Sequence, residues 1–138
     1  PLGPMYQAGT LSGNPLAVAA GVATLRALGR PEVYQRLDAM AGTLVQGLVE
    51  AARDAEAPVT VNRVGSMFTS FFTAGPVSSQ VEAEGSDTKR YGRFFHSMLY
   101  KGFYLAPAQF EAGFVSLAHT DNDIEATISA ASEVLKHV

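Results

Sequence analysis

The sequence predicts an α+β fold in which a short, mainly antiparallel sheet is covered by helices. Several long segments carry apolar residues at spacings of three and four, which is the period of an amphipathic helix. Between them lie short runs rich in β-branched and aromatic residues, which are typical of strands. The order along the chain is two helices, two strands, one helix, two strands and one helix, with no internal repeat. This order favours an α+β unit.

Composition limits the classes of function. The chain has 138 residues, of which 47% are hydrophobic and 17% charged, enough apolar material for a core. No apolar stretch reaches the roughly 20 residues of a membrane-spanning helix, so we expect no membrane partner. A net charge of −3 without a basic face argues against nucleic acid. The absence of cysteine excludes disulfides and thiolate sites and fits a cytoplasmic location.

The first helix is predicted over residues 15–28, after the hydroxyl-rich turn of residues 9–15. A helix start offers backbone N–H groups at the positive end of its dipole, so the turn could bind a phosphate or carboxylate. Simple capping explains the same residues. Asn14 is a favoured N-cap, Pro15 fits the first helical turn, and Gly13 is conformationally permissive.

A second, longer helix is predicted over residues 31–57. Gly42 and Gly47 each weaken it by about 1 kcal/mol relative to alanine, so packing must hold it. Its apolar stripe comprises Val33, Leu37, Met40, Leu44 and Leu48. Residues 59–64 and 67–73 then predict two neighbouring antiparallel strands, and residues 74–85 predict a loop.

The remaining elements are a helix, two short strands and a closing helix. Ser86 is predicted as the N-cap of the helix, with Asp87 in its first turn and Gly102 at its end. Its expected buried face is Tyr91, Phe94, Phe95, Met98 and Leu99. Short strands are expected at residues 103–105 and 114–117. Thr120 and Asp123 form a capping box for the closing helix, which buries Ile124, Ile128, Ala131 and Leu135.

Four segments in this order resemble the glutamate-1-semialdehyde 2,1-aminomutases, members of the class-III aminotransferase family. The segments are residues 3–17, 86–88, 93–96 and 103–119, so the resemblance spans nearly the whole chain. The turn at residues 10–15 matches the wider family, and Gln-Phe-Glu-Ala-Gly at residues 109–113 narrows the match to the aminomutases.

The resemblance implies the C-terminal part of a fold-type-I transferase that uses pyridoxal 5'-phosphate and pyridoxamine 5'-phosphate. Residues 1–30 would end the large cofactor-binding domain, residues 31–57 would form an interdomain helix, and residues 58–138 would form the small domain. Gly9 and Thr10 would contact the cofactor phosphate of the partner subunit in a homodimer. Because Pro1 is not an initiator Met, we expect a piece of a longer polypeptide.

The reaction implied by the resemblance converts glutamate-1-semialdehyde to 5-aminolevulinate, for porphyrin biosynthesis. Such chemistry needs a Schiff-base lysine. Lys89, Lys101 and Lys136 are the lysines present, and each has the sequence environment of a surface residue. The family's lysine motif lies upstream of these residues, so we expect the chain alone to be inactive. His96, His119 and His137 are too far apart to predict a metal site.

Glu111 is the candidate for substrate selection. As a lone acid among apolar residues, it is either a solvated loop residue or a group that needs a partner. In the aminomutases the matching glutamate lies at the active site, where related aminotransferases have an arginine for the substrate carboxylate. An acid there would repel an α-carboxylate. Gln109 and Ser116 are expected to add hydrogen bonds nearby.

Two alternatives remain. An ω-aminotransferase of the same family would have an arginine near position 111, and no arginine lies there. A non-catalytic interaction module would present its apolar helix stripe to another protein.

Overall fold

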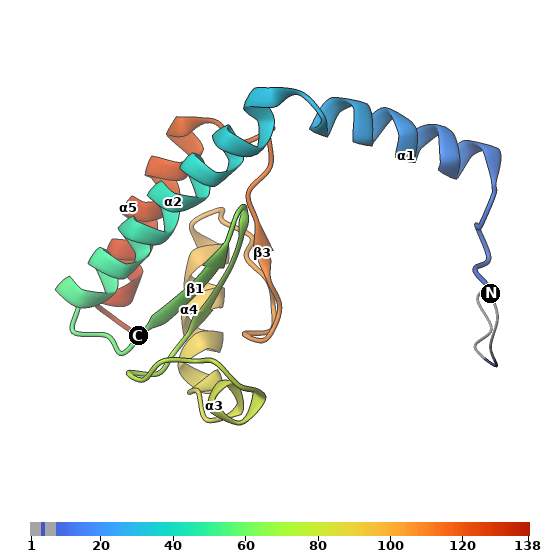
Figure 1. Ribbon diagram of the computed structural model, residues 1–138. Helices are drawn as coiled ribbons and strands as arrows, with labels where there is room; N and C mark the ends of the chain where they lie inside the picture. The colour runs from blue at the N-terminus through green and yellow to red at the C-terminus, as the bar shows by residue number, and fades with distance from the viewer. Residues whose placement is uncertain (1–3, 5–7) are drawn as a thin grey trace. The chain divides into compact units, whose positions relative to one another are not determined.

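The computed structural model describes residue 4 and residues 8–138, so residues 3 and 5–7 of the resembling segment 3–17 lie outside the described part. The chain divides into two compact units, Pro1–Val33 and Tyr34–Val138. Figure 1 shows the elements of both. Each unit is described by itself below.

Helix α1, Pro15–Leu28, dominates the first unit. It starts as predicted, because the Asn14 side chain accepts hydrogen bonds from the N–H groups of Leu16 and Ala17 at 3.0 and 3.1 Å. None of its residues is buried, and Leu16 and Leu25 are 80% and 70% exposed. A helix with this much apolar surface needs a covering surface, and the described residues of its own unit do not supply one.

Helix α2, Pro31–Asp54, begins as predicted and buries the whole predicted stripe. It ends three residues before the predicted position 57. Glu56 has a φ of 52°, and this left-handed conformation is incompatible with continuing the helix. The Ala57 N–H donates instead to the carbonyl of Ala52 at 2.8 Å, which turns the chain toward the sheet.

The predicted antiparallel hairpin is present as β1, Thr60–Val64, and β2, Met67–Phe71. Strand β3, Gly113–Phe114, pairs with β2 and gives the sheet order β1-β2-β3. The predicted strand at residues 103–105 is wrong, because the Phe103 N–H is used to close the preceding helix. The predicted strand at 114–117 is confirmed only at Phe114.

The loop prediction for residues 74–85 is wrong in part, because it contains a short helix, α3, Gln80–Glu84. The Ser79 side chain caps this helix by accepting a hydrogen bond from the Glu82 N–H at 3.3 Å. The Glu82 carboxylate accepts from the N–H and hydroxyl of Ser78 at 2.7 and 2.8 Å. These local bonds stabilise a turn of helix too short to show an apolar period.

Helix α4, Thr88–Tyr100, differs from the prediction at its start. Its N-cap is Asp87 rather than Ser86, because the Asp87 carboxylate accepts from the Arg90 N–H at 2.9 Å. Ser86 is buried instead. Four of the five predicted core residues of this helix are buried, including Phe95, whereas Leu99 is 41% exposed.

Gly102 ends α4 as predicted. Its φ of 92° is left-handed, and the N–H groups of Gly102 and Phe103 donate to the carbonyls of Leu99 and Met98 at 2.9 Å each. This pair of bonds is the Schellman arrangement, which reverses the chain. The segment after Gly102 therefore runs back toward Tyr91.

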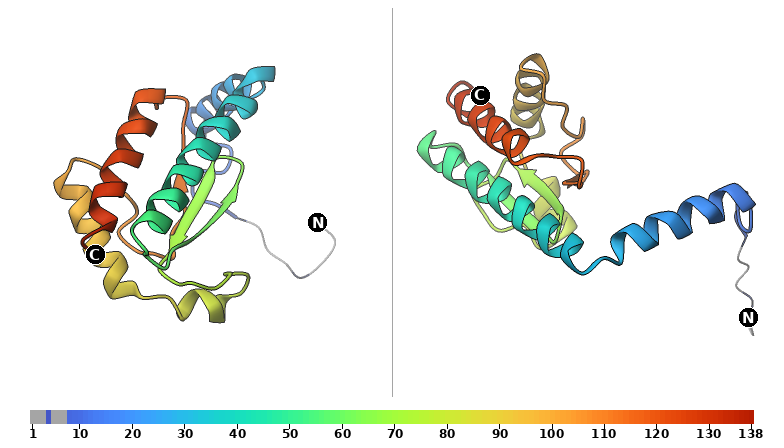
Figure 2. Two further views of the ribbon diagram at one scale, coloured as in Figure 1. Left: turned by 90° about the vertical axis from the view of Figure 1, so that its left-hand side faces the viewer. Right: turned by 90° about the horizontal axis from the view of Figure 1, so that it is seen from above.

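Helix α5, Asp121–Leu135, begins with the predicted Thr120–Asp123 capping box. Helices α2 and α5 run side by side in the same direction (Figures 1 and 2). The core of this unit lies between α2, α4, α5 and the sheet face that carries Val61 and Phe68. The sheet is thus covered by helices, as predicted.

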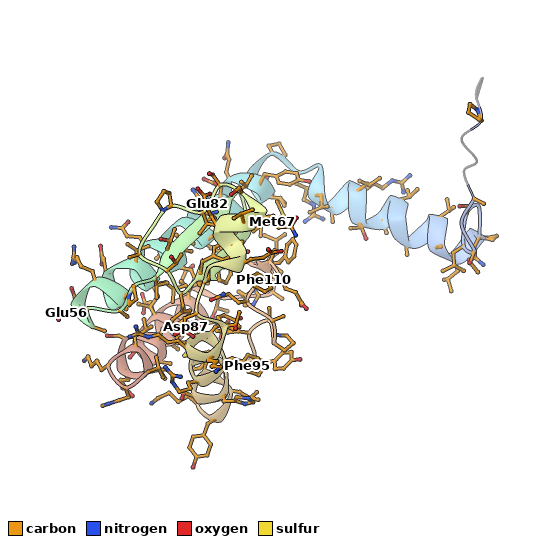
Figure 3. The ribbon with its side chains drawn as sticks, turned by 90° about the horizontal axis from the view of Figure 1, so that it is seen from below. Glu56, Met67, Glu82, Asp87, Phe95 and Phe110 are labelled. Atoms are coloured by element: carbon orange, nitrogen blue, oxygen red, sulfur yellow. The ribbon has the colours of Figure 1, made fainter. Side chains whose placement is uncertain are left out.

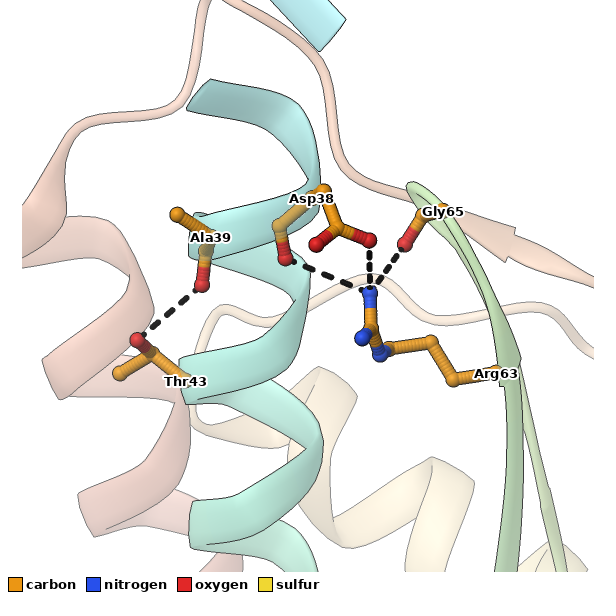
Figure 4. Close-up of polar contacts among 5 residues, drawn as sticks. All are labelled: Asp38, Ala39, Thr43, Arg63 and Gly65. Carbon is orange, nitrogen blue, oxygen red and sulfur yellow. Dashed lines mark hydrogen bonds and ion pairs between the residues drawn. The ribbon is translucent and has the colours of Figure 1, made fainter. Parts of the chain in front are cut away.

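Arg63 ties the hairpin to α2 (Figure 4). Its Nη1 atom lies 2.6 Å from Asp38 Oδ1 and also donates to the Gly65 carbonyl at 2.8 Å. The guanidinium therefore contacts both the helix and the hairpin turn.

Candidate functional site

The first predicted site is the turn before α1. The Ser12 N–H donates to the Gly9 carbonyl and the Asn14 N–H to the Leu11 carbonyl, both at 3.0 Å, which makes two successive turns. Gly13 has a φ of 75°, a left-handed conformation that suits glycine. A β-carbon at Gly9 would lie 2.6 Å from Ser12 Oγ, so a larger residue here would require the exposed Ser12 side chain to rotate away.

Thr10 is exposed in this turn. Of the two alternatives for the start of α1, the structure shows the capping. Asn14 takes the N–H groups of Leu16 and Ala17 with its side chain and that of Val18 with its carbonyl, and Pro15 has none. An anion at this turn would therefore bind the Thr10 hydroxyl and turn amides, not the first-turn amides of α1.

The second predicted site is Glu111, which lies in the second unit and is exposed. Its N–H donates to the Ala108 carbonyl at 3.2 Å, closing a turn whose central residues are Gln109 and Phe110. Its own carbonyl accepts from Thr69 Oγ1 of β2 at 3.4 Å. Phe110 points outward and is 53% exposed (Figure 3).

Glu111 lines a cavity of about 740 Å³ between the sheet, the helices and the segment after Gly102. Its polar lining includes Tyr91, Gln109, Glu111, His119 and Asp123, and no described residue that lines it is arginine or lysine. Burial raises the pKa of the Tyr91 phenol, and the negative charge of Glu111 raises this pKa further. The polar part of the cavity thus has an acidic character.

The sequence predicts that Gln109 and Ser116 add hydrogen bonds near Glu111, and the structure gives the two side chains different partners. Gln109 is only 2% exposed and accepts a hydrogen bond from the Phe72 N–H at 2.9 Å, so it holds the turn from inside. Ser116 is directed to His119 instead. The N–H and hydroxyl of Ser116 lie 3.0 and 3.1 Å from His119 Nδ1.

Tyr91 lines the cavity and holds its wall in place, which the sequence does not reveal. It belongs to the predicted aromatic core face and is indeed 7% exposed, but its hydroxyl donates to the Ala106 carbonyl at 2.5 Å. This bond fixes the start of the segment that carries Glu111. The apolar spacing of α4 predicts burial only, and gives no signal for this contact.

The three lysines are surface residues, as the sequence predicts. Lys89, Lys101 and Lys136 are all exposed, and Lys101 pairs with Glu133. None of the three lysines lines the cavity. Within the described residues, no group of histidine and acidic side chains is suited to hold a metal ion. No helix in that part of the chain is long and apolar enough to cross a membrane.

Comparison with known proteins shows which family this chain resembles. The model of the aminotransferase class-III family matches residues 2–135. A glutamate-1-semialdehyde 2,1-aminomutase of Desulforamulus reducens is 58% identical over 131 residues, which are 95% of this chain and 30% of that protein. A protein of the same name from Roseiflexus castenholzii is 54% identical over the full 138 residues and 32% of its own length. The chain thus spans about a third of these relatives.

Solved structures share the fold. An omega-transaminase of Sphaerobacter thermophilus is 26% identical, with a TM-score of 0.78 over 96% of this chain and 30% of that one. A glutamate-1-semialdehyde-aminomutase of Pseudomonas aeruginosa PAO1, in complex with PMP, has a TM-score of 0.82 over 98% of this chain and 30% of its own, at 21% identity. With the family model matching nearly every residue, the chain belongs to the class-III aminotransferase family.

Proposed function

We propose that this chain is the C-terminal portion of a glutamate-1-semialdehyde 2,1-aminomutase. The intact enzyme would convert glutamate-1-semialdehyde to 5-aminolevulinate for porphyrin biosynthesis. The observation that carries this proposal is the lining of the cavity, where Glu111 and Asp123 are present and arginine and lysine are absent among the described residues. The identity of 54% and 58% to proteins of this name supports it.

The acidic lining suits the proposed substrate. Placing an α-carboxylate beside Glu111 would juxtapose like charges, which costs up to several kcal/mol. An amino group or an aldehyde carries no such penalty, and a protonated amine would gain a charge-assisted hydrogen bond. Glu111 would therefore select which end of the substrate faces this side of the active site.

The cofactor of the intact enzyme would be pyridoxal 5'-phosphate or its pyridoxamine form, which supplies the electron sink for amino transfer. The turn before α1 fits its phosphate. The Thr10 side chain is exposed, and Gly9 has no side chain to hinder close approach to the backbone. We propose that Gly9 and Thr10 hold the phosphate of the partner subunit in a homodimer.

The chain alone would lack a catalytic lysine. All three lysines are exposed, and none lines the cavity. A Schiff-base lysine needs a depressed pKa, which requires burial or neighbouring cations. The activity would therefore belong to a longer polypeptide that contains these residues.

An interaction module is the second candidate, and the exposed apolar surface of α1 favours it. The two proposals differ in cofactor binding, because an interaction module has no specific site for pyridoxal phosphate.

The experiment that tests the proposal compares Glu111→Arg and Glu111→Gln in the full-length enzyme. We expect either change to lower kcat/KM for glutamate-1-semialdehyde by about tenfold or more, since tenfold corresponds to about 1.4 kcal/mol. Glu111→Arg should also raise transamination of an α-keto acid acceptor. Glu125→Gln is the matched control, because Glu125 is exposed in α5 and does not line the cavity. Unchanged kcat/KM in both Glu111 variants would overturn the proposal.

A further inference from the structure

Gln109 is a buried polar residue that the stability of the fold does not explain. Its side chain is 2% exposed, and Oε1 accepts the Phe72 N–H at 2.9 Å. Its Nε2 atom has no hydrogen-bond partner among the described residues. A buried amide with its donors unmet costs free energy, so the bond to the Phe72 N–H explains Oε1 but leaves the burial of Nε2 unexplained.

The orientation of this amide is fixed by its one bond. Exchanging Oε1 and Nε2 would place two donors, Nε2 and the Phe72 N–H, against each other. The side chain therefore joins the end of β2 to the turn of residues 108–111, across 37 positions of sequence. Buried polar groups that lack a hydrogen-bond partner are found mainly at functional sites.

The turn that Gln109 anchors is the one that carries Glu111. The Glu111 N–H closes this turn on the Ala108 carbonyl at 3.2 Å, and only Phe110 separates Gln109 from Glu111. A second, weaker tether comes from Thr69 Oγ1, which lies 3.4 Å from the Glu111 carbonyl. Both tethers start on the central strand β2 or directly after it, so this strand is the reference for the position of Glu111.

We infer that Gln109 is a positioning residue, which sets the Glu111 carboxylate through its bond to the Phe72 N–H. This inference rests on the proposed function. Without the bond between Gln109 and Phe72, the turn of residues 108–111 would gain conformational freedom. Glu111 would still be present, but its carboxylate would no longer be held in the productive position. Gln109 thus acts on the substrate only through Glu111.

A double-mutant cycle in the full-length enzyme tests this. Gln109→Met keeps the size of the side chain and removes the acceptor, and it is measured with Glu111 intact and in a Glu111→Gln background. We expect Gln109→Met to lower kcat/KM for glutamate-1-semialdehyde about tenfold in the first case and less than about twofold in the second, because coupled residues are not additive. Amide exchange at Phe72 should rise in both backgrounds.

A merely structural role gives a different result. If Gln109→Met lowers kcat/KM equally in both backgrounds, the inference is overturned while the proposed function stands. If Glu111→Gln alone has no effect, the proposed function fails and the inference fails with it. Should Gln109→Met not fold, Gln109→Leu, which also lacks the acceptor, takes its place in the cycle. Equal effects of Gln109→Leu in both backgrounds then overturn the inference.

Discussion

Gly47 of α2 packs against Ile128 of α5 so closely that a β-carbon at position 47 would lie 2.5 Å from Ile128 Cδ1. Glycine costs a helix about 1 kcal/mol relative to alanine. Here that cost allows two helices to approach each other, and the helix is held by packing, as the sequence predicts.

Replacing Gly47 should therefore destabilise the protein. We expect Gly47→Ala to lower the free energy of unfolding by up to about 2 kcal/mol, because overpacking costs about 1–3 kcal/mol and exceeds the gain in helix propensity. Urea unfolding of the intact protein measures this. Gly42→Ala is the matched control, since its nearest neighbour would be Arg63 Nη2 at 4.0 Å, and it should stabilise. Stabilisation by both changes would contradict the packing argument.

Thr10 should matter for cofactor affinity rather than for stability, because its side chain is exposed. A hydrogen bond to a charged group contributes about 1.5–3 kcal/mol, so Thr10→Val should weaken pyridoxal phosphate binding by about tenfold or more. Thr10→Ser keeps the hydroxyl and should retain most of the affinity. Equilibrium dialysis of the full-length enzyme gives both values. Equal affinity of the Val and Ser variants would exclude the hydroxyl as a phosphate ligand.

The Tyr91 phenol should report the charge of Glu111. Burial and the Glu111 carboxylate raise the pKa of Tyr91 above its ordinary value of 10.0. Because the folded state holds this proton more tightly, its contribution to stability is present below pH 10.0 and is lost as the pH rises through the folded-state pKa. Glu111→Gln should lower the pKa of Tyr91 only in part, since burial remains. Carbon NMR of labelled tyrosine follows this titration, and an unchanged pKa would place the carboxylate away from Tyr91.

The capping box should contribute to acid sensitivity. Hydrogen bonds from the Thr120 N–H and hydroxyl hold the pKa of Asp123 below its ordinary value of 3.8. A depressed folded-state pKa means that the stabilisation is complete above pH 3.8 and is lost as the pH falls through the lower value. Thr120→Val removes the hydroxyl and should move the pKa of Asp123 part of the way back. Carboxyl NMR titration measures it, and no movement would show that the backbone N–H alone accounts for the depression.

Arg63 should stabilise the protein by more than its ion pair with Asp38 alone contributes. Asp38 is exposed enough that Asp38→Ala should cost about 0.2–1 kcal/mol, with a smaller cost at high salt. Arg63→Met should cost more, because it also removes the hydrogen bonds to the Gly65 and Asp38 carbonyls. Urea unfolding at two salt concentrations separates the two effects. Equal costs for both changes would mean that the carbonyl bonds contribute nothing.

Elements with a strong local signal could be predicted from the sequence. The Asn14 cap, the stripe of α2, the hairpin and the Thr120–Asp123 box are all confirmed. Each depends on residues a few positions apart, so spacing and capping chemistry determine it.

The predictions that are wrong concern features that tertiary contacts determine. The N-cap of α4 lies at Asp87 because the Asp87 N–H also donates to the Phe72 carbonyl at 3.0 Å, a contact distant in sequence. Residues 103–105 have strand composition, but the end of α4 takes the Phe103 N–H. The Glu111 site followed the same pattern. The motif predicts Glu111 as a candidate and Gln109 as a nearby hydrogen-bonding residue, whereas the partners of Gln109 and Tyr91, Phe72 and Ala106, appear only in the folded chain.

The pairing of α2 with α5 also constrains when the second unit can fold during synthesis. The hairpin and α4 lie between α2 and α5 in the sequence. The chain must therefore close a loop across most of the unit, at a cost in entropy, before α2 and α5 can bury their apolar surface against each other. While the ribosome is still translating residues 121–135, the apolar stripe of α2 can pack against the sheet and α4 but lacks the cover that α5 supplies. The part of α2 that faces α5 therefore stays exposed until α5 is complete.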